Sequence, residues 1–280
     1  MLLCFHANMR ILFFGDITGK IGRQALKKVL PELKKEFEPD LVLANGENMA
    51  HGQGVTEEAL KEVLDAGVDY LTNGDHTFAL GGSEQILADA KNPILRPLNW
   101  PGNAVGRGFT IINIGAKRVL IVNLIGRVFM KHDFDDPFTK VKELLDDYSL
   151  GGKEQGSEAV SAIIVDFHAE ATSEKAALAW FLDGKISTLL GTHTHVPTAD
   201  EKILPQGTAF ISDIGMVGAM DSVLGADKEI VIKRFLTQRL FKIEPAESNK
   251  AEVNGVLLEI NDKTGLAENI SRLRRMVVLE

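Results

Sequence analysis

Short apolar runs that end in a polar residue recur along this chain, and a loop and then a helical pattern follow them. Residues 10–14 (RILFF) form the first run, residues 41–44 the second and residues 70–72 the third. Between the first two, the apolar residues at 26, 29, 30, 33 and 37 repeat with a helical period and share one face. Buried strands that alternate with amphipathic helices predict an α/β protein with a largely parallel sheet.

Local signals add detail to this prediction. Pro31 lies inside the first helical pattern, so the helix is expected to be kinked or split there. Thr56 is placed to cap a helix that ends near Ala66. Residues 109–124 carry two apolar runs around a four-residue turn, which predicts a hairpin. Residues 146–158 are polar and predict a flexible surface excursion, and two runs within residues 253–278 are expected to pair.

Composition limits the class of protein. The 280 residues are 45% hydrophobic and 25% charged, which is enough for a large buried core. No clear linker divides the chain, so we predict a single domain over residues 9–280 with a small capping element or insertion. Met9 offers an alternative start, which makes residues 1–8 an N-terminal extension.

Charge and hydropathy also restrict the partners. No apolar run approaches the roughly 20 residues of a membrane-spanning helix, so no membrane partner is expected. The net charge of −8 argues against binding to duplex nucleic acid, which favours a strong basic excess. Cys4 stands alone and cannot form an internal disulfide, which favours a reducing compartment and a cytoplasmic location.

Side chains that can bind metal follow the three apolar runs above and two further predicted strands, residues 162–167 and 187–190. Open α/β sheets bind their ligands at the carboxyl ends of the strands, so these side chains converge if those ends lie on one side. The pair His193-x-His195 is expected to share one face, because alternate residues of an extended segment do so. The candidate residues, in chain order, are Asp16, Glu47, Asn48, Asp75, His76, His168, His193 and His195.

Each of these residues alone has an ordinary structural explanation. The metal site is predicted because all of them occupy the same position, at the end of a strand. A single Asp after a strand is usually a cap or turn residue, and a single His is usually a satisfied buried side chain. Imidazole nitrogens with carboxylate and amide oxygens suit Fe, Mn or Zn. Two such ions held about 3.5–4 Å apart can share a hydroxide and clamp a phosphate between them, and a bridging carboxylate can serve both.

At these residues the chain resembles a known superfamily. The elements GD, GEN, GDH, DFHAE and GTHTH around the candidate ligands are similar to those of the calcineurin-like metallophosphoesterases. The stretches NGENMAHGQG, HAEATSEK, GTHTHVPTAD and ILPQGTAFISDIGM resemble more closely the YmdB-like bacterial branch of 2′,3′-cyclic nucleotide phosphodiesterases. The resemblance runs from about Met9 to beyond Ile230. It implies a β-sandwich of mixed sheets flanked by helices, with a small capping element, and it suggests a homo-oligomer.

The resemblance also implies roles for the candidate residues. Asp16, Glu47, Asn48 and His195 would hold one metal, and Glu47 would bridge to a second. Asp75, His168 and His193 would also hold that second ion. Both ions would most simply be Fe or Mn, with Zn as an alternative. His76 would protonate the departing alkoxide of a small phosphodiester or nucleotide substrate.

One position departs from the family pattern. Asp75 stands where the family usually has Asn, so three carboxylates instead of two face the ions. The additional negative charge should hold metal more tightly while polarising hydroxide and phosphate less. The departure leaves open a regulatory metal-binding protein with little turnover. A metal-dependent amidohydrolase, which also uses His-x-His, is the weaker alternative because its pair normally follows an early strand.

Five further polar residues could have either a functional or a structural role. Arg23, Arg96 and Arg127 could meet a substrate phosphate or serve in structural ion pairs. His51 lies in a glycine-rich loop and could touch substrate or simply shape the loop. His132 lies among acidic residues, which favours a solvated patch over a ligand set.

Overall fold

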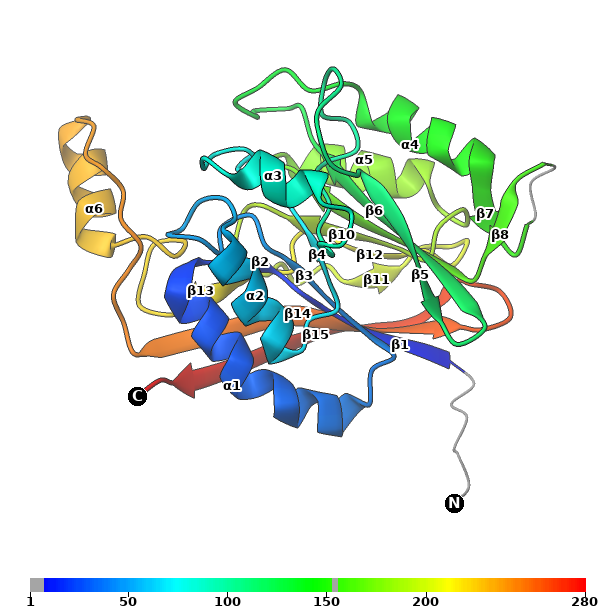
Figure 1. Ribbon diagram of the computed structural model, residues 1–280, viewed down its shortest axis with the longest axis horizontal. Coiled ribbons are helices and arrows are strands. Elements are labelled where there is room, and N and C mark those ends of the chain that lie inside the picture. The colour runs from blue at the N-terminus through cyan, green and yellow to red at the C-terminus, as the bar shows by residue number, and fades with distance from the viewer. Residues whose placement is uncertain (1–7, 153–155) are drawn as a thin grey trace.

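A computed structural model describes residues 8–152 and 156–280 (Figure 1). Two mixed β-sheets pack face to face, and helices cover their outer faces. In spatial order, the first sheet contains β2 (Asp16–Ile17), β13 (Met216–Ala219), β14 (Lys250–Asn261), β1 (Asn8–Phe14), β3 (Leu41–Asn45) and β4 (Tyr70–Thr72), with β15 (Ala267–Val278) paired to β14.

The second sheet lies across the buried core from the first. Its spatial order is β11 (Lys202–Ile203), β12 (Ala209–Ile211), β10 (Thr188–Thr192), β9 (Ala162–His168), β6 (Lys117–Ile125) and β5 (Phe109–Ile114). The strands β6, β9, β10 and β12 run parallel, and β5 and β6 form the predicted hairpin. A separate two-stranded sheet joins β7 (Tyr148–Leu150) to β8 (Glu158–Val160), which begins where the predicted excursion ends.

Three hydrophobic clusters build a helix–sheet–sheet–helix sandwich. Along β1, Ile11 and Phe13 enter the core between the sheets, whereas Leu12 and Phe14 pack toward α1. Both faces of this strand are buried, which explains why its sequence is apolar without alternation. The helices are α1 (Gly19–Phe37), α2 (Glu57–Ala66) and α3 (Ser83–Ala88) by the first sheet, α4 (Pro137–Asp147) and α5 (Thr172–Phe181) by the second, and α6 (Lys228–Thr237).

The sequence-based expectations for the elements are largely confirmed. Thr56 caps α2 by accepting a hydrogen bond from the backbone N–H of Ala59, and β14 pairs antiparallel with β15. Of the expected kink or split at Pro31, the split is wrong, because one helix runs through Pro31, and the kink stays a prediction. Pro31 and Lys27 are both exposed, so water can bond the carbonyl that proline leaves without its donor. The single-domain boundary stays a prediction, and residues 1–7, including Cys4, lie outside the described residues.

The expectation of a largely parallel sheet is wrong in its details. The parallel strands β1, β3 and β4 are joined on one side to β14, which runs antiparallel to both β1 and β13. The C-terminal hairpin of β14 and β15 is therefore part of the first sheet, where β14 lies next to β1. Such a long-range pairing leaves no signal in local periodicity, because it depends on which edge of the sheet the last strands meet.

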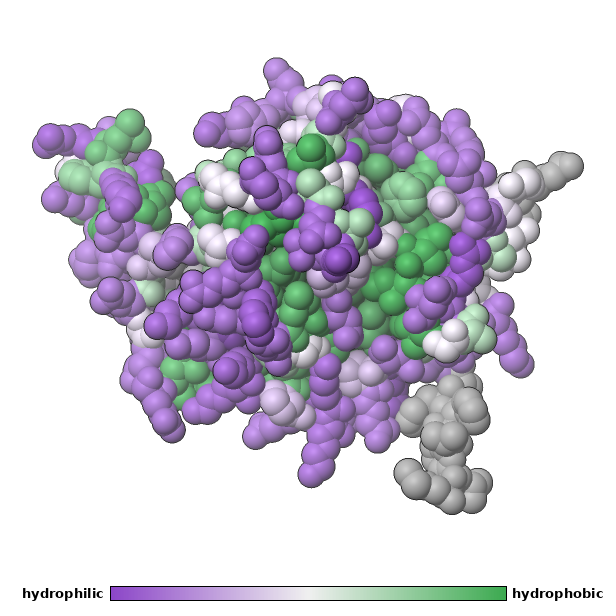
Figure 2. Space-filling view, in the orientation of Figure 1, coloured by the Kyte–Doolittle hydropathy of each residue, from purple (hydrophilic) through white to green (hydrophobic). Residues whose placement is uncertain are grey.

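The helix α6 projects from the body of the sandwich as an arm (Figure 1). Among the described residues it has no buried position, and Phe235 and Leu236 are 75% and 81% exposed. Figure 2 shows apolar side chains gathered on this arm. The sequence analysis did not predict α3, α4 or α6. Within the described residues, no helix is both long and apolar enough to cross a membrane.

Candidate metal centre

The carboxyl ends of strands from both sheets meet at one place. Asp16, Glu47 and Asp75 follow β1, β3 and β4 of the first sheet, while His168 ends β9 and His193 follows β10 of the second. Their ligand atoms form two groups in which all atoms lie within 4.8 Å of one another. Glu47 belongs to both groups. The groups are Glu47, Asp75, His168 and His193, and Asp16, Glu47 and His195.

A glycine makes room for this convergence. A Cβ atom on Gly74 would lie 2.1 Å from Glu47 Oε2 and 2.2 Å from His168 Nε2. Any side chain at this position would therefore displace one of the candidate ligands. The glycine of the GDH element is thus required by the close approach of the backbone to the site.

His168 is oriented by a buried chain of hydrogen bonds. Its Nδ1 lies 2.9 Å from the Thr192 hydroxyl, which donates to Asp166 Oδ1 at 2.8 Å. The hydroxyl therefore accepts from Nδ1–H, and the other ring nitrogen faces the site. His168 Nε2 lies 3.0 Å from Glu47 Oε2 and 3.3 Å from Asp75 Oδ1.

The segment that carries the two histidines after β10 is not extended, contrary to the sequence-based expectation. His193 and His195 have φ angles of 98° and 65°, so both lie in the left-handed region instead of an extended segment. His193 Nδ1 lies 3.0 Å from His168 Nε2 in the first group. His195 donates from Nδ1 to the Leu224 carbonyl at 2.9 Å, which leaves Nε2 facing the second group.

Asn48 and His76 stand beside the shared carboxylate. The Asn48 amide nitrogen donates to Glu47 Oε1 at 2.7 Å and lies 3.2 Å from His195 Nε2. Its oxygen lies 2.8 Å from His76 Nδ1. Ligation of a metal by this oxygen would require the amide to turn over. The His76 backbone N–H also donates to Glu47, over 3.3 Å.

The electrostatics of the buried side chains depend on the histidines. Burial would raise the pKa of Glu47, but the charge and hydrogen bond of His168 hold it well below its ordinary value. Burial would likewise lower the pKa of His168, yet Glu47, Asp75 and Asp16 raise it well above the usual range. For Asp16, burial prevails and raises the pKa to about 7. Burial and the neighbouring His168 lower the pKa of His193 to about 4.

The donor set fits metal ions. Asp16 Oδ1 is buried and has no hydrogen-bond partner among the residues that the structure describes. A buried carboxylate oxygen without a partner is costly, and a cation would satisfy it. Nitrogen atoms of His168 and His193 converge with carboxylate oxygens in the same space. This mixture of nitrogen and oxygen donors, with one carboxylate common to both groups, suits a pair of borderline metal ions.

We expect metal binding to weaken as the pH falls through about 7. Below about pH 7 Asp16 is protonated, because its pKa is about 7, and a metal ion must displace that proton. His168 must also release a proton to bind a metal through Nε2. Apparent affinity should fall about tenfold per pH unit for each proton displaced. Titration calorimetry with Mn²⁺ between about pH 5.5 and 8.5, in two buffers of different ionisation enthalpy, measures affinity and proton release together. A pH-independent affinity with no proton release would contradict this expectation.

The other polar candidates lie outside the two groups. Arg23 bonds the Met49 carbonyl and pairs with Glu62 at 2.7 Å, so it supports the loop after β3. Arg96 donates to the Pro97 carbonyl at 2.8 Å. Arg127 lies 3.8 Å from an oxygen of Asp136 on the surface, and His132 and His51 are exposed. None of these five residues belongs to the two groups found in the described part of the chain.

One contact was missed by the sequence analysis. Glu170 Oε2 lies 3.1 Å from His193 Nε2, on the side of the ring away from the first group. A carboxylate in this place fixes the orientation of an imidazole whose other nitrogen faces a metal site. The HAEATSEK stretch contains Glu170, but a motif match alone does not indicate which histidine it contacts.

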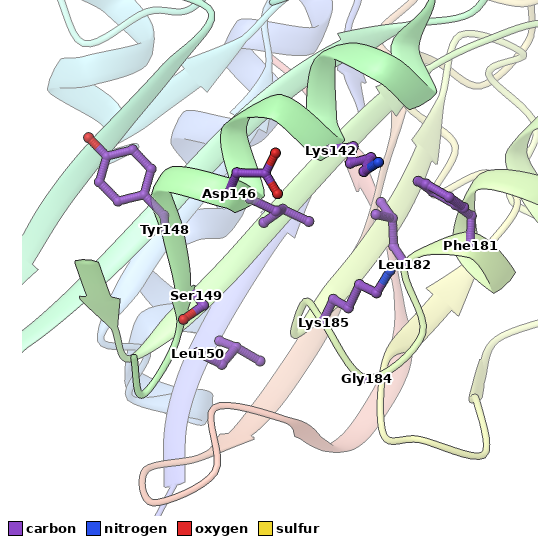
Figure 3. A pocket seen from close by; sticks show the side chains of 10 residues that line it. Lys142, Asp146, Tyr148, Ser149, Leu150, Phe181, Leu182, Gly184 and Lys185 are labelled. Atoms are coloured by element: carbon purple, nitrogen blue, oxygen red, sulfur yellow. The ribbon is translucent and has the colours of Figure 1, made fainter. Parts of the chain in front are cut away.

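A cavity elsewhere in the molecule is separate from this centre. A cavity of about 340 Å³ is lined by Lys142, Tyr148, Phe181 and Lys185, among others. Figure 3 shows these side chains. It lies at the end of α5 that ends at Phe181, whereas the metal-competent side chains lie near the beginning of that helix. Within the described part of the chain, none of the residues that line this cavity belongs to the two candidate groups.

Two mixed sheets packed face to face, with a shared carboxylate between two donor groups at their common edge, define the metallophosphoesterase class. The chain belongs to the YmdB-like protein family, whose model matches residues 12–273. It is 42% identical over 265 residues to a Bacillus subtilis (strain 168) protein named 2′,3′-cyclic-nucleotide 2′-phosphodiesterase, covering 95% of this chain and 96% of that protein.

Solved structures agree with this assignment. A crystal structure from Mycoplasma pneumoniae, described as a novel phosphatase, has a TM-score of 0.88 and 33% identity, covering 97% of this chain and 95% of that one. A hypothetical protein from Thermus thermophilus has a TM-score of 0.87 and 37% identity, covering 96% of this chain and 100% of that one. The predicted sandwich of mixed sheets flanked by helices is thereby confirmed.

Proposed function

We propose that this chain is a metal-dependent phosphoric diester hydrolase that acts on 2′,3′-cyclic nucleotides or related small phosphodiesters. The observation that carries the proposal is the position of Glu47 in both groups of candidate ligands. A shared carboxylate is the arrangement that holds two ions close enough to act on one phosphate. The activity in the name of the Bacillus subtilis relative supports the substrate class.

In this proposal the two groups divide the ligands. Asp16, Glu47, Asn48 and His195 would hold one ion, and Glu47, Asp75, His168 and His193 the other. The ions would neutralise the phosphate oxygens and lower the pKa of bound water. Fe and Mn are the ions we favour, with Zn as an alternative, because the donors combine imidazole with carboxylate.

His76 is proposed to donate the proton to the leaving oxygen. Glu47 Oε1 lies 3.4 Å from its Nδ1 and can accept from that nitrogen when the Asn48 amide turns toward the metal, which leaves Nε2 for the substrate. Burial would lower the pKa of His76, but the hydrogen bond and charge of Glu47, together with Asp75, raise it above its ordinary value. The raised pKa favours the protonated imidazole, and a protonated imidazole is what a general acid requires.

Hydrolysis assays on the metal-loaded protein test the proposal. We expect turnover of bis(p-nitrophenyl) phosphate and of 2′,3′-cyclic AMP with Mn²⁺ or Fe²⁺ supplied, and two metal ions per chain by elemental analysis. Two bound ions without turnover would favour the regulatory metal-binding alternative. Absence of bound metal would overturn the proposal.

Four further properties remain predictions. Gel filtration with light scattering tests the homo-oligomer, and localisation of a tagged chain tests the cytoplasmic location. The capping element and the single domain over residues 9–280 are tested by limited proteolysis. A metal-dependent amidohydrolase is disfavoured because it would leave the GDH element, with Asp75 and His76 in the site, without a role.

The exchange Asp75→Asn is expected to retain or raise phosphodiesterase turnover while weakening metal binding. Asp75 adds a negative charge 3.3 Å from His168 and 3.5 Å from His193, measured between its Oδ1 and the ring nitrogens. Removing that charge leaves the ions more electrophilic toward phosphate. Turnover at saturating Mn²⁺ and the Mn²⁺ dissociation constant give the two readouts. A large loss of turnover with both ions still bound would contradict this expectation.

A further inference from the structure

We propose that the buried ion pair between Lys175 and Asp213 positions the loop that sends His193 and His195 to different ligand groups. The inference rests on the proposed function, because it concerns how the two groups are kept apart. Neither residue belongs to the groups themselves. Both are therefore positioning residues, which act on the site through the loop between β10 and β11.

The pair is wholly enclosed. Lys175 on α5 is 0% exposed and Asp213 is 1% exposed, and Lys175 Nζ lies 3.0 Å from Asp213 Oδ2. Burying two charges costs free energy, and apolar side chains of similar size would fill the same space without that cost. A Cβ atom on Gly191 would lie 2.9 Å from Lys175 Cδ and 1.8 Å from the Ser212 carbonyl oxygen. The lysine stem therefore fills the space directly beneath the end of β10.

The carboxylate of this pair holds the residue between the two histidines. Asp213 Oδ2 accepts hydrogen bonds from the Thr194 backbone N–H at 3.0 Å and from the Thr194 hydroxyl at 2.7 Å. Its other oxygen accepts from the Gly215 N–H at 2.8 Å. Together with the Lys175 ammonium, these donors surround one carboxylate, and the lysine supplies the positive charge that compensates its burial.

The backbone on each side of Thr194 needs such support. His193 and His195 both have positive φ angles, which side chains other than glycine adopt at a cost. Strained conformations persist only where the surrounding structure fixes them. The Asp213 carboxylate fixes Thr194 at the centre, the His193 N–H donates to Asp16 Oδ2 at 3.2 Å, and His195 is fixed by the Leu224 carbonyl.

The consequence concerns the division of ligands. If Thr194 were released, residues 193–195 could relax toward an extended conformation, in which alternate side chains point to the same face. Both imidazoles would then compete for one group. The ion pair is thus proposed to convert a His-x-His sequence, which suits one metal, into two ligands for two metals.

A matched pair of variants at Thr194 tests the inference. Thr194→Val removes the hydroxyl but keeps the shape, whereas Thr194→Ser keeps the hydroxyl. We expect Thr194→Val to weaken Mn²⁺ binding about 10- to 100-fold, as is typical of groups that orient metal ligands, and Thr194→Ser to bind like the wild type. Chelator competition gives the affinities. Electron paramagnetic resonance of the Mn²⁺-loaded proteins distinguishes a coupled pair of ions from a single ion.

The ion pair itself is tested by Asp213→Asn, whose amide nitrogen would face donors instead of accepting from them. We expect this variant to lose the coupled signal at Mn²⁺ concentrations that give it in the wild type. Thermal unfolding in the presence of a chelator shows whether each variant is folded. If Asp213→Asn does not fold, the Thr194 pair alone decides the question.

The inference is overturned if Thr194→Val binds two ions with wild-type affinity and gives the wild-type coupled spectrum. It is also overturned if Thr194→Ser fails in the same way as Thr194→Val, because the hydroxyl would then not be the active feature. These outcomes differ from failure of the proposed function, in which the wild-type chain itself binds no pair of ions.

Discussion

Replacing Glu47 with glutamine is expected to lower phosphodiesterase turnover by about 10³-fold or more and to remove the coupled pair of metal ions. Glu47 is 1% exposed and is the member common to both ligand groups. Glutamine has the same shape but offers one neutral oxygen in place of two charged ones. The loss of metal-derived charge stabilisation is several kcal/mol, and each step of about 1.36 kcal/mol is a factor of ten in rate. Metal content and turnover, measured on the same sample, check this result.

Glu58→Gln is the matched control, because Glu58 is exposed in the first turn of α2 and lies outside both groups. It should retain two ions and wild-type turnover. Circular dichroism of both variants confirms that the fold is kept. If Glu47→Gln still bound two coupled ions and turned over normally, the shared carboxylate would not organise the site.

The exchange His76→Ala is expected to reduce turnover of 2′,3′-cyclic AMP by about 10²- to 10⁴-fold, the usual contribution of a general acid, while both metal ions stay bound. The leaving group of that substrate is a ribose alkoxide, which is basic and needs a proton. Bis(p-nitrophenyl) phosphate releases a stable phenolate and needs little assistance. We therefore expect a much smaller loss with this second substrate.

His132→Ala serves as the control for His76→Ala, since His132 is exposed and lies outside the two groups. It should leave both rates unchanged. Equal losses with the two substrates in His76→Ala would assign His76 a role other than proton donation. Loss of metal from His76→Ala would indicate that its bonds to Asn48 and Glu47 serve to hold the ligands.

Prediction from the sequence succeeded where the signal is local. A strand buried on both faces, such as β9, has a continuous apolar run, and Thr56 meets the requirements of a helix cap. The arm formed by α6 was missed because none of its described residues is buried, so its apolar residues do not mark a packed face. The mixed order of the first sheet was missed because β14 joins β1 from the far end of the chain.

The candidate site shows the same division. Each polar residue after a strand was found from its position, because parallel strands deliver such residues to one edge of a sheet. The expectation for His193 and His195 was wrong because it assumed extended backbone. Their conformation depends on Asp213 and Leu224, which lie well beyond them along the chain.

By itself, the sequence determined which side chains stand at the strand ends and therefore which donor atoms are present, because burial of a strand and the polarity of the residue after it are local properties. Only the tertiary structure decided how those donors are grouped. It brought the edges of two sheets together, placed Glu47 in both groups and placed His193 and His195 in different groups. Grouping depends on distances between residues far apart in the chain, and those distances follow from how the two sheets pack.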